Sequence, residues 1–396
     1  MNIAQEPRRV RALDTTKRFV RKPLKNTPLK VHQDFRKLLF KMRKNADKIS
    51  PYANGLGTDK SATSKCGQVP INENGIRHIH LLKGEQSQKP YFHGLIKCGN
   101  VWRCPVCAKK ISDYRQKEIY YLASEWQRKE KKLSFITLTI RHLKSDRPQD
   151  IVDRLVTEFR KLQRTSKWKK LKEKHKIEGF CKSLEFTFSK KHWLHPHLHI
   201  LLFHNSENSE QLHDELIRMW VKRKETRSVL KAQNAKSVYD KTGISNYVTK
   251  WDVSAELTKA NHKLGKAKEN VSPFQALKML TEGNCGSFTQ KELAHRWMNY
   301  RSITYRKHHI QLSRNLKAML KDGDFKESED ILKDEKPDQL IARIDKELWT
   351  VIIKKELPPQ ILNAWEKGGH KEIAKLLITH QINYIWEPHR LRLSLR

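Results

Sequence analysis

The stretch KSLEFTFSKKHWLHPHLHILLF, residues 182–203, predicts two β-strands joined by a turn. Its first part, KSLEFTF (182–188), and its last part, HLHILLF (197–203), carry the apolar, aromatic and β-branched residues that are typical of strands. The intervening SKKHWLHP has turn character. A hairpin of two antiparallel strands is therefore the expected centre of the fold.

Two histidines on the second strand of this hairpin are candidate metal ligands. On an extended strand, His197 and His199 project to one face, whereas Leu198 and Ile200 project to the other. Two imidazoles about 7 Å apart along one face can hold a divalent ion, and the hairpin would lay Glu185 beside them. Such a set suits Mg²⁺ or Mn²⁺, with positions left open for water and phosphate oxygens. The alternative is an ordinary strand histidine pair with a solvated glutamate.

The flanking segments predict the fold class. SFITLTI (134–140) reads as a strand, apolar residues three and four apart indicate a helix over 151–162, and LHDELIRMWVKRK (212–224) is another amphipathic helix. This β-α-β-β-α order predicts an α+β fold with a helix-covered, largely antiparallel sheet of the ferredoxin-like kind. After about Thr281 the pattern is entirely helical, and Pro358–Pro359 breaks the chain before a last helix through Ile361 and Trp365.

A second candidate metal site is formed by cysteines. KCGNVWRCPVCAKK contains Cys98, Cys104 and Cys107, and Cys66 lies upstream. A C-P-x-C turn brings two thiolates to one ion, so the set predicts a structural, all-cysteine Zn²⁺ site without an open position. Rival fourth ligands are His78, His80 and His93, and the remaining alternative is a group of ordinary thiols. Two further cysteines in apolar contexts are expected in the core: Cys181 and Cys285.

The charge indicates a polyanionic partner. Lys and Arg number 81 against 43 Asp and Glu, a formal net charge of +38, which favours nucleic acid over ribosomal association or an anionic membrane surface. No apolar run is long enough to cross a bilayer, and the N-terminus lacks the apolar core of a signal peptide. We therefore expect a cytoplasmic protein, whose reducing surroundings keep zinc thiolates intact.

One basic segment is a candidate DNA contact. The helix expected after residue 162 carries Lys167, Trp168, Lys169 and Lys170. The lysines would follow phosphates and Trp168 would stack on an unpaired base. The alternatives are a solvated lysine face and a tryptophan packed beneath the helix.

Composition shifts divide the chain into four expected parts. They are a basic arm (1–60) with one helix around 34–48, a zinc-binding module (61–115), an α+β domain (116–285) and a helical C-terminal region (286–396).

These motifs together resemble the rolling-circle plasmid replication initiators of the HUH (His-hydrophobe-His) endonuclease superfamily. The matching pieces, in order, are CGNVWRCPVCAKKI, FITLTI, LEFTFSKKHWLHPHLHILL, NYVTKW, SPFQALKML and HHIQLSRNLKAML. The resemblance runs from about Cys66 to Leu320. It implies an HUH endonuclease fold for the catalytic part, with the zinc module upstream.

The resemblance also implies a mechanism. His197 and His199 would be ligands of Mg²⁺ or Mn²⁺, with Glu185 as the third ligand. Tyr247 takes the position of the nucleophile and Lys250 that of the lysine three residues on. Tyr247 would nick one strand at the plasmid origin, keep the 5′-phosphate as a phosphotyrosine, and rejoin the strand at termination. Origin DNA, duplex and single-stranded, would be the substrate, and a host helicase and polymerase would be partners in a bacterial cytoplasm.

One position departs from the family's pattern. Many relatives have a glutamate four residues before the tyrosine, where this chain has Gly243, so termination would use another residue, a second protomer of a homo-oligomer, or Tyr239. Two other functions stay open. One is a single-tyrosine transposase or mobilisation relaxase, although these usually lack the C-P-x-C turn. The other is a zinc-containing DNA-binding regulator with an inactive nuclease fold.

Overall fold

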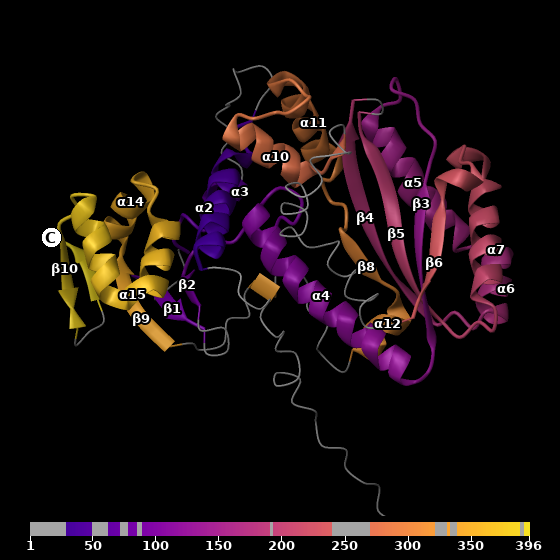
Figure 1. Cartoon of the computed structure of the whole chain (residues 1–396), viewed down its shortest axis with the longest axis horizontal. Coiled ribbons are helices and arrows are strands. Elements are labelled where there is room, and N and C mark those ends of the chain that lie inside the picture. The colour runs from indigo at the N-terminus through magenta and orange to yellow at the C-terminus, as the bar shows by residue number, and fades with distance from the viewer. Residues whose placement is uncertain are drawn as a thin grey trace, which may run out of the picture.

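The computed structural model forms two β-sheets with their own cores (Figure 1). It describes residues 29–49, 62–71, 78–84, 89–190, 193–239, 270–320, 331–332, 339–388 and 392–396. Its helices are α2 (Leu29–Ala46), α3 (Ala62–Lys65), α4 (Pro105–Arg128), α5 (Pro148–Leu162), α6 (Ser166–Lys174), α7 (Ser209–Val221), α10 (Pro273–Glu282), α11 (Gln290–Ile303), α12 (Arg314–Met319), α14 (Lys346–Lys354) and α15 (Pro358–Thr379). Its strands are β1 (His78–Lys83), β2 (Pro90–His93), β3 (Lys132–Thr139), β4 (Gly179–Ser189), β5 (His195–His204), β6 (Asn234–Val238), β7 (Asn270–Val271), β8 (Ile310–Leu312), β9 (Gln339–Asp345), β10 (Tyr384–Glu387) and β11 (Arg392–Leu395).

The larger sheet has the strand order β6-β3-β5-β4-β7, and β8 pairs with β4 as well. All its described pairings are antiparallel. The expected β-α-β-β-α order is confirmed, because α5 and α6 connect β3 to β4, the hairpin leads into β5, and α7 follows. Strand β5 lies between β3 and β4, so the β3-helix-β4 unit is split by an intervening strand. The α+β class with antiparallel sheets is therefore confirmed.

Helices cover both faces of the larger sheet because successive strand residues point to opposite sides. On one face, apolar residues of α5, α6 and α7 pack against alternate residues of β3, β4 and β5, among them Leu184, Leu198, Ile200 and Leu202. On the other face, the second half of α4 and α12 cover the residues in between, among them Phe135, Cys181, Leu201 and Phe203. The second face is covered at the end where Trp126 meets Phe203, with ring centroids 5.5 Å apart.

The smaller sheet has the order β10-β11-β9-β1-β2 and is covered by α14 and α15. It corrects the expectation of an entirely helical region after Thr281, since β8, β9, β10 and β11 all follow that residue. The strand QLIARID, β9, gains its partner from β1, which lies roughly 260 residues earlier. A long-range pairing of this kind leaves no periodic signal in the local sequence. The segments expected as a zinc module and as a C-terminal region thus build one sheet together.

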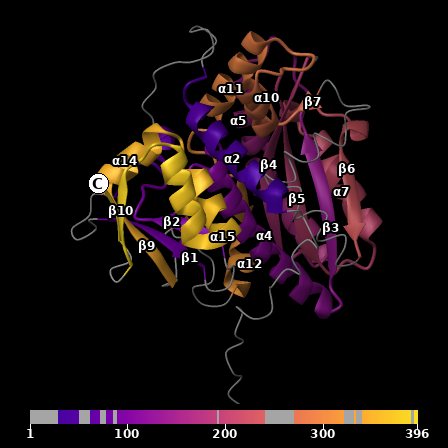
Figure 2. The ribbon, with the colours of Figure 1, turned by 60° about the vertical axis from the view of Figure 1, so that its left-hand side comes forward.

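Helix α2, expected around residues 34–48, is confirmed and lies between the two sheets (Figures 1 and 2). At its end, the Ala46 carbonyl accepts a hydrogen bond from Trp297 Nε1 of α11 at 2.7 Å. Near its start, Arg36 donates to Asn363 Oδ1 at 2.6 Å and pairs with Glu366, both on α15. The helix thus joins the two cores. None of the helices in the described ranges combines the length and apolar character that a membrane crossing needs.

Candidate active site and cysteine cluster

The hairpin of β4 and β5 brings the three expected metal ligands together. Glu185 pairs with His197 across the two strands, and Ser183 pairs with His199. Directly paired residues face the same side, so all three candidate ligands share one face. Glu185 Oε2 lies 3.5 Å from His197 Nε2 and 3.1 Å from His199 Nε2. Their ligand atoms all lie within 4.8 Å of one another, close enough for a single ion.

Contacts behind His199 fix the orientation of its ring. His199 Nδ1 lies 2.9 Å from Thr137 Oγ1 on the neighbouring strand β3, and its ring stacks on Phe135 with centroids 5.0 Å apart. An ion bound at Nε2 requires the proton on Nδ1, which then donates to the threonine hydroxyl. In that tautomer Thr137 accepts from Nδ1–H and Nε2 is free for a metal. Sequence reasoning missed this residue, because its role depends on the register between β3 and β5.

The row of histidines on β5 extends beyond the pair. The rings of His197 and His199 meet edge to face at 4.7 Å, and the ring of His195 lies 5.9 Å from that of His197. His142 Nε2 is 3.2 Å from His195 Nδ1. His195 could have been found from the His-x-His-x-His spacing, whereas His142 follows β3 and gives no signal in the sequence.

The electrostatics of the site keep Glu185 anionic. Burial opposes ionisation of this carboxyl, but His199 and His197 outweigh it and hold the pKa of Glu185 well below its ordinary value. Ser183 also donates a hydrogen bond to the carboxylate, at 3.3 Å. One carboxylate and two imidazoles on one side of an ion leave its other side open to ligands from outside. The donor set therefore fits a divalent cation that contacts a substrate.

The four expected cysteines also meet. Sγ of Cys66 lies 3.4 Å from Sγ of Cys107 and 3.7 Å from that of Cys104, and Cys98 Sγ lies 3.8 Å from Cys107 Sγ. The four sulfurs lie within 4.8 Å of one another, an arrangement suited to a tetrahedral metal. Burial lowers the pKa of the Arg43 guanidinium, and the negative charge of the four neighbouring cysteines only partly opposes this shift.

Local sequence explains the geometry of the C-P-x-C turn. Cys104 is the N-cap of α4, Pro105 takes the first helical position, and the Cys107 amide donates to Cys104 Sγ at 3.5 Å. Gly67, next to Cys66, has a φ of +64°, and a Cβ there would come 2.8 Å from Arg43 Nη1. The helix start and this glycine turn together bring both parts of the cluster close to each other.

Two of the rival zinc ligands lie elsewhere. His80 and His93 pair across β1 and β2, and their rings stack with centroids 5.9 Å apart. The described four-ligand group contains Cys66 and neither of these histidines, while the side chain of His78 lies outside the described residues. Cys181 is buried in the core, as expected, and burial raises its pKa. Cys285 is half-buried and packs against the core of the larger sheet.

The basic helix α6 places its residues on two sides. Trp168 is 4% exposed and packs on Phe159, with ring centroids 6.1 Å apart. This agrees with the alternative interpretation, in which the tryptophan packs beneath the helix. Thr165 caps the helix by accepting from the Trp168 amide at 3.2 Å. The three neighbouring lysines are exposed: Lys167, Lys169 and Lys170.

The expected nucleophile Tyr247, with Lys250 and Gly243, lies outside the described residues. Tyr239 is described, follows β6 and is 88% exposed. Its neighbour Val238 pairs with Leu133 of β3, whereas His199 pairs with Thr137 of the same strand. Leu133 and Thr137 are four residues apart, which is about 13 Å along the strand. Tyr239 is therefore held at the far end of the sheet from the Glu185–His197–His199 group.

Known proteins resemble this chain in part. A protein-family model described as "Replication protein" matches residues 93–352. The chain is 40% identical over 62 residues to "Protein rep" of Streptomyces lividans and 36% identical over 62 residues to "Neomycin resistance protein" of Streptomyces cyanogenus. Each alignment covers 16% of this chain, and the chain spans 14% of the length of each relative. No solved structure matches the chain significantly.

Proposed function

Because this chain belongs to the replication protein family, we propose that it is a plasmid rolling-circle replication initiator, an endonuclease that nicks and rejoins one strand of origin DNA. The observation that carries the proposal is the Glu185–His197–His199 group on one face of the β4–β5 hairpin, inside the matched residues. The strand order β6-β3-β5-β4 supports a ferredoxin-like sheet of the HUH type.

The three ligands would hold Mg²⁺ or Mn²⁺ against the scissile phosphate. When bound, the ion neutralises phosphate charge and polarises phosphorus, which is worth several kcal/mol in the transition state. Thr137 would accept from Nδ1–H of His199 when Nε2 binds the ion, and the hairpin keeps Glu185 within reach of both imidazoles. These residues are thus proposed to orient the phosphate for in-line attack.

Tyr247 is the proposed nucleophile. Its phenolic oxygen loses its proton to solvent and forms a bond to phosphorus while the bond from phosphorus to the 3′-oxygen breaks, and the 3′-oxygen takes up a proton from solvent as it leaves. Lys250 is proposed to lower the pKa of the phenol. Tyr247 comes eight residues after Tyr239, and eight extended residues span up to about 26 Å. This reach exceeds the distance of about 13 Å along β3 between the partner of Val238 and the partner of His199. The 5′-phosphate stays on the tyrosine, so the reverse attack by a 3′-OH rejoins the strand without another energy source.

The rest of the chain is proposed to support this reaction. The cluster of Cys66, Cys98, Cys104 and Cys107 would hold structural Zn²⁺. The net charge of +38 supports binding of origin DNA as duplex and as single strand, with the exposed lysines of α6 among the contacts. A host helicase and polymerase would extend the freed 3′-end in a bacterial cytoplasm. A homo-oligomer could supply a second nucleophile for termination.

Incubation of the purified protein with supercoiled origin plasmid and Mn²⁺ tests the proposal. His199→Ala and Tyr247→Phe should each abolish nicking, whereas His80→Ala, a histidine of the other sheet, should leave it unchanged. Mass spectrometry should find a nucleotide adduct on Tyr247. Duplex binding by the wild type without nicking would identify a DNA-binding regulator instead. Nicking without an adduct would indicate a hydrolytic nuclease.

A further inference from the structure

A basic hollow lies at the edge of the larger sheet where β8 pairs with β4, and residues of α5 on one face and of α4 and α12 on the other line it. Along β4, Lys182 and Leu184 line the hollow, whereas Ser183 and Glu185 alternate with them and face the other side. The hollow has a volume of about 690 Å³. This size lies within the ~300–1,000 Å³ typical of ligand clefts.

Cations from five segments line the hollow, and its described lining residues include no aspartate or glutamate. Six of them are Arg115, Arg160, Lys182, Arg306, Lys307 and Lys317. Arg115 pairs with Glu118, and Lys307 pairs with Asp153. For Arg160 and Lys182, the described part of the chain provides no acid within ion-pair distance.

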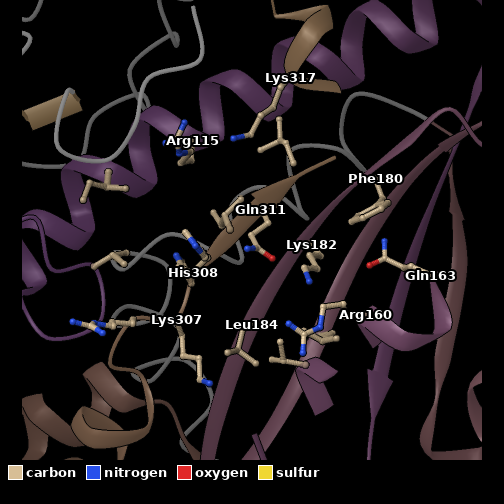
Figure 3. A pocket seen from close by; sticks show the side chains of 18 residues that line it. Arg115, Arg160, Gln163, Phe180, Lys182, Leu184, Lys307, His308, Gln311 and Lys317 are labelled. Atoms are coloured by element: carbon tan, nitrogen blue, oxygen red, sulfur yellow. The ribbon is translucent and has the colours of Figure 1, made fainter. Parts of the chain in front are cut away.

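Arg160 and Lys182 repel each other across this space. Burial, and then the charge of Arg160, lowers the pKa of Lys182 to about 8. The Lys182 ammonium also lies 5.2 Å from the ring of Phe159. Figure 3 shows Lys182 and Arg160 directed into the same space, with the amides of Gln163 and Gln311 beside them. An anion there would remove the repulsion and accept hydrogen bonds from both cations.

The size and lining favour a polyanion with apolar parts. The hollow is larger than a single phosphate needs, and its cations stand on separate segments, as successive phosphates of one strand require. Apolar side chains such as Phe180 and Leu184 lie between the cations, where sugars or bases can pack. We infer that this hollow binds the backbone of a single DNA strand, as a second nucleic-acid site at the β4–β8 edge of the sheet whose lining includes none of the three candidate metal ligands. The choice of DNA rests on the proposed function.

A charge-matched pair of double variants tests this site. Arg160→Gln with Lys182→Gln removes two charges from the hollow, and Lys354→Gln with Lys355→Gln removes two exposed charges at the end of α14. We expect the first pair to weaken binding of a labelled single-stranded oligonucleotide about tenfold. It should also lower the slope of log K against log salt by about 1.4, which corresponds to two phosphate contacts. The second pair should change affinity less than about twofold.

Two further measurements distinguish a loss of DNA binding in the hollow from a folding defect and from a failure of the proposed function. Arg160 is exposed, so Arg160→Gln alone keeps the fold and should weaken binding about threefold. A photo-crosslinking residue in place of Gln311 should attach to the oligonucleotide, also in a His199→Ala background that cannot nick. Crosslinking without nicking by the wild type would refute only the proposed function. Unchanged affinity of the double variant, or protection of the crosslinking residue by dAMP and not by the oligonucleotide, would overturn the inference.

Discussion

At the scale of single residues, we expect the hydroxyl of Thr137 to support the proposed metal binding by His199. Thr137→Val keeps the shape of the side chain but removes the acceptor 2.9 Å from His199 Nδ1. Loss of a supporting contact of this kind typically lowers metal affinity about 10- to 100-fold. Titration with Mn²⁺ followed by electron paramagnetic resonance should show this loss. Thr137→Ser, which keeps the hydroxyl, should restore most of the affinity, and equal loss in both variants would contradict the role.

His204 should make stability depend on pH. Its Nδ1 accepts from the Ser206 amide at 3.2 Å and its Nε2 lies 2.8 Å from Ser134 Oγ, so the buried ring is held neutral. Burial, followed by the charges of His213 and Lys132, lowers its pKa to about 4 from an ordinary 6.5. Between these values the unfolded state binds more protons, so stability is complete above pH 6.5 and falls as the pH drops to 4.

The size of this effect is on the order of 3 kcal/mol. Urea unfolding at several pH values should show the fall, and His204→Gln should remove about that much of it. A residual slope is expected, because burial also lowers the pKa of His309 to about 4. An unchanged pH dependence in His204→Gln would contradict the assignment.

At the scale of elements, the sequence pattern predicted those contacts that form between neighbouring segments of the chain. The β4–β5 hairpin and the pairing of Glu185 with the two histidines could be predicted, since the two strands are neighbours in sequence and side chains alternate with period two. The role of Thr137 could not, because it depends on the register between β3 and β5. Strand β9 was missed for the same reason, as its partner β1 is distant in sequence.

The start of α4 should lose its structure if the proposed Zn²⁺ of the cysteine cluster is removed. Cys104 caps the helix, and Cys107 in its first turn reaches Cys66 from another segment. Cys107→Ser should therefore give protein with less than one equivalent of zinc and a thermal midpoint lower by several degrees. Elemental analysis and calorimetry measure both quantities. Cys285→Ser, outside the cluster, should change neither, and well-folded wild type without zinc would refute the site.

At the scale of the whole molecule, α2 couples the two sheets. Arg36 is partly buried and holds Asn363 and Glu366 of α15. Arg36→Met leaves these groups without their cation, at a cost of about 1–3 kcal/mol. We expect calorimetry to show the smaller sheet unfolding before the larger one. Lys44→Met breaks the exposed pair of the same helix with Glu356, which is worth at most about 1 kcal/mol, and should leave the transition intact.

The pairing of β1 with β9 also sets the order of events on the ribosome. His78 meets Asp345 only after roughly 270 more residues have been made, which takes about 14 to 54 seconds at about 5–20 residues per second. During that interval the larger sheet, whose strands β3 to β6 are close in sequence, can complete itself. The strand β1 is thus synthesised early but pairs with β9 only near the end of translation. Nascent chains would expose the apolar side chains of β1, such as Ile79 and Leu81, to chaperones until translation is nearly finished.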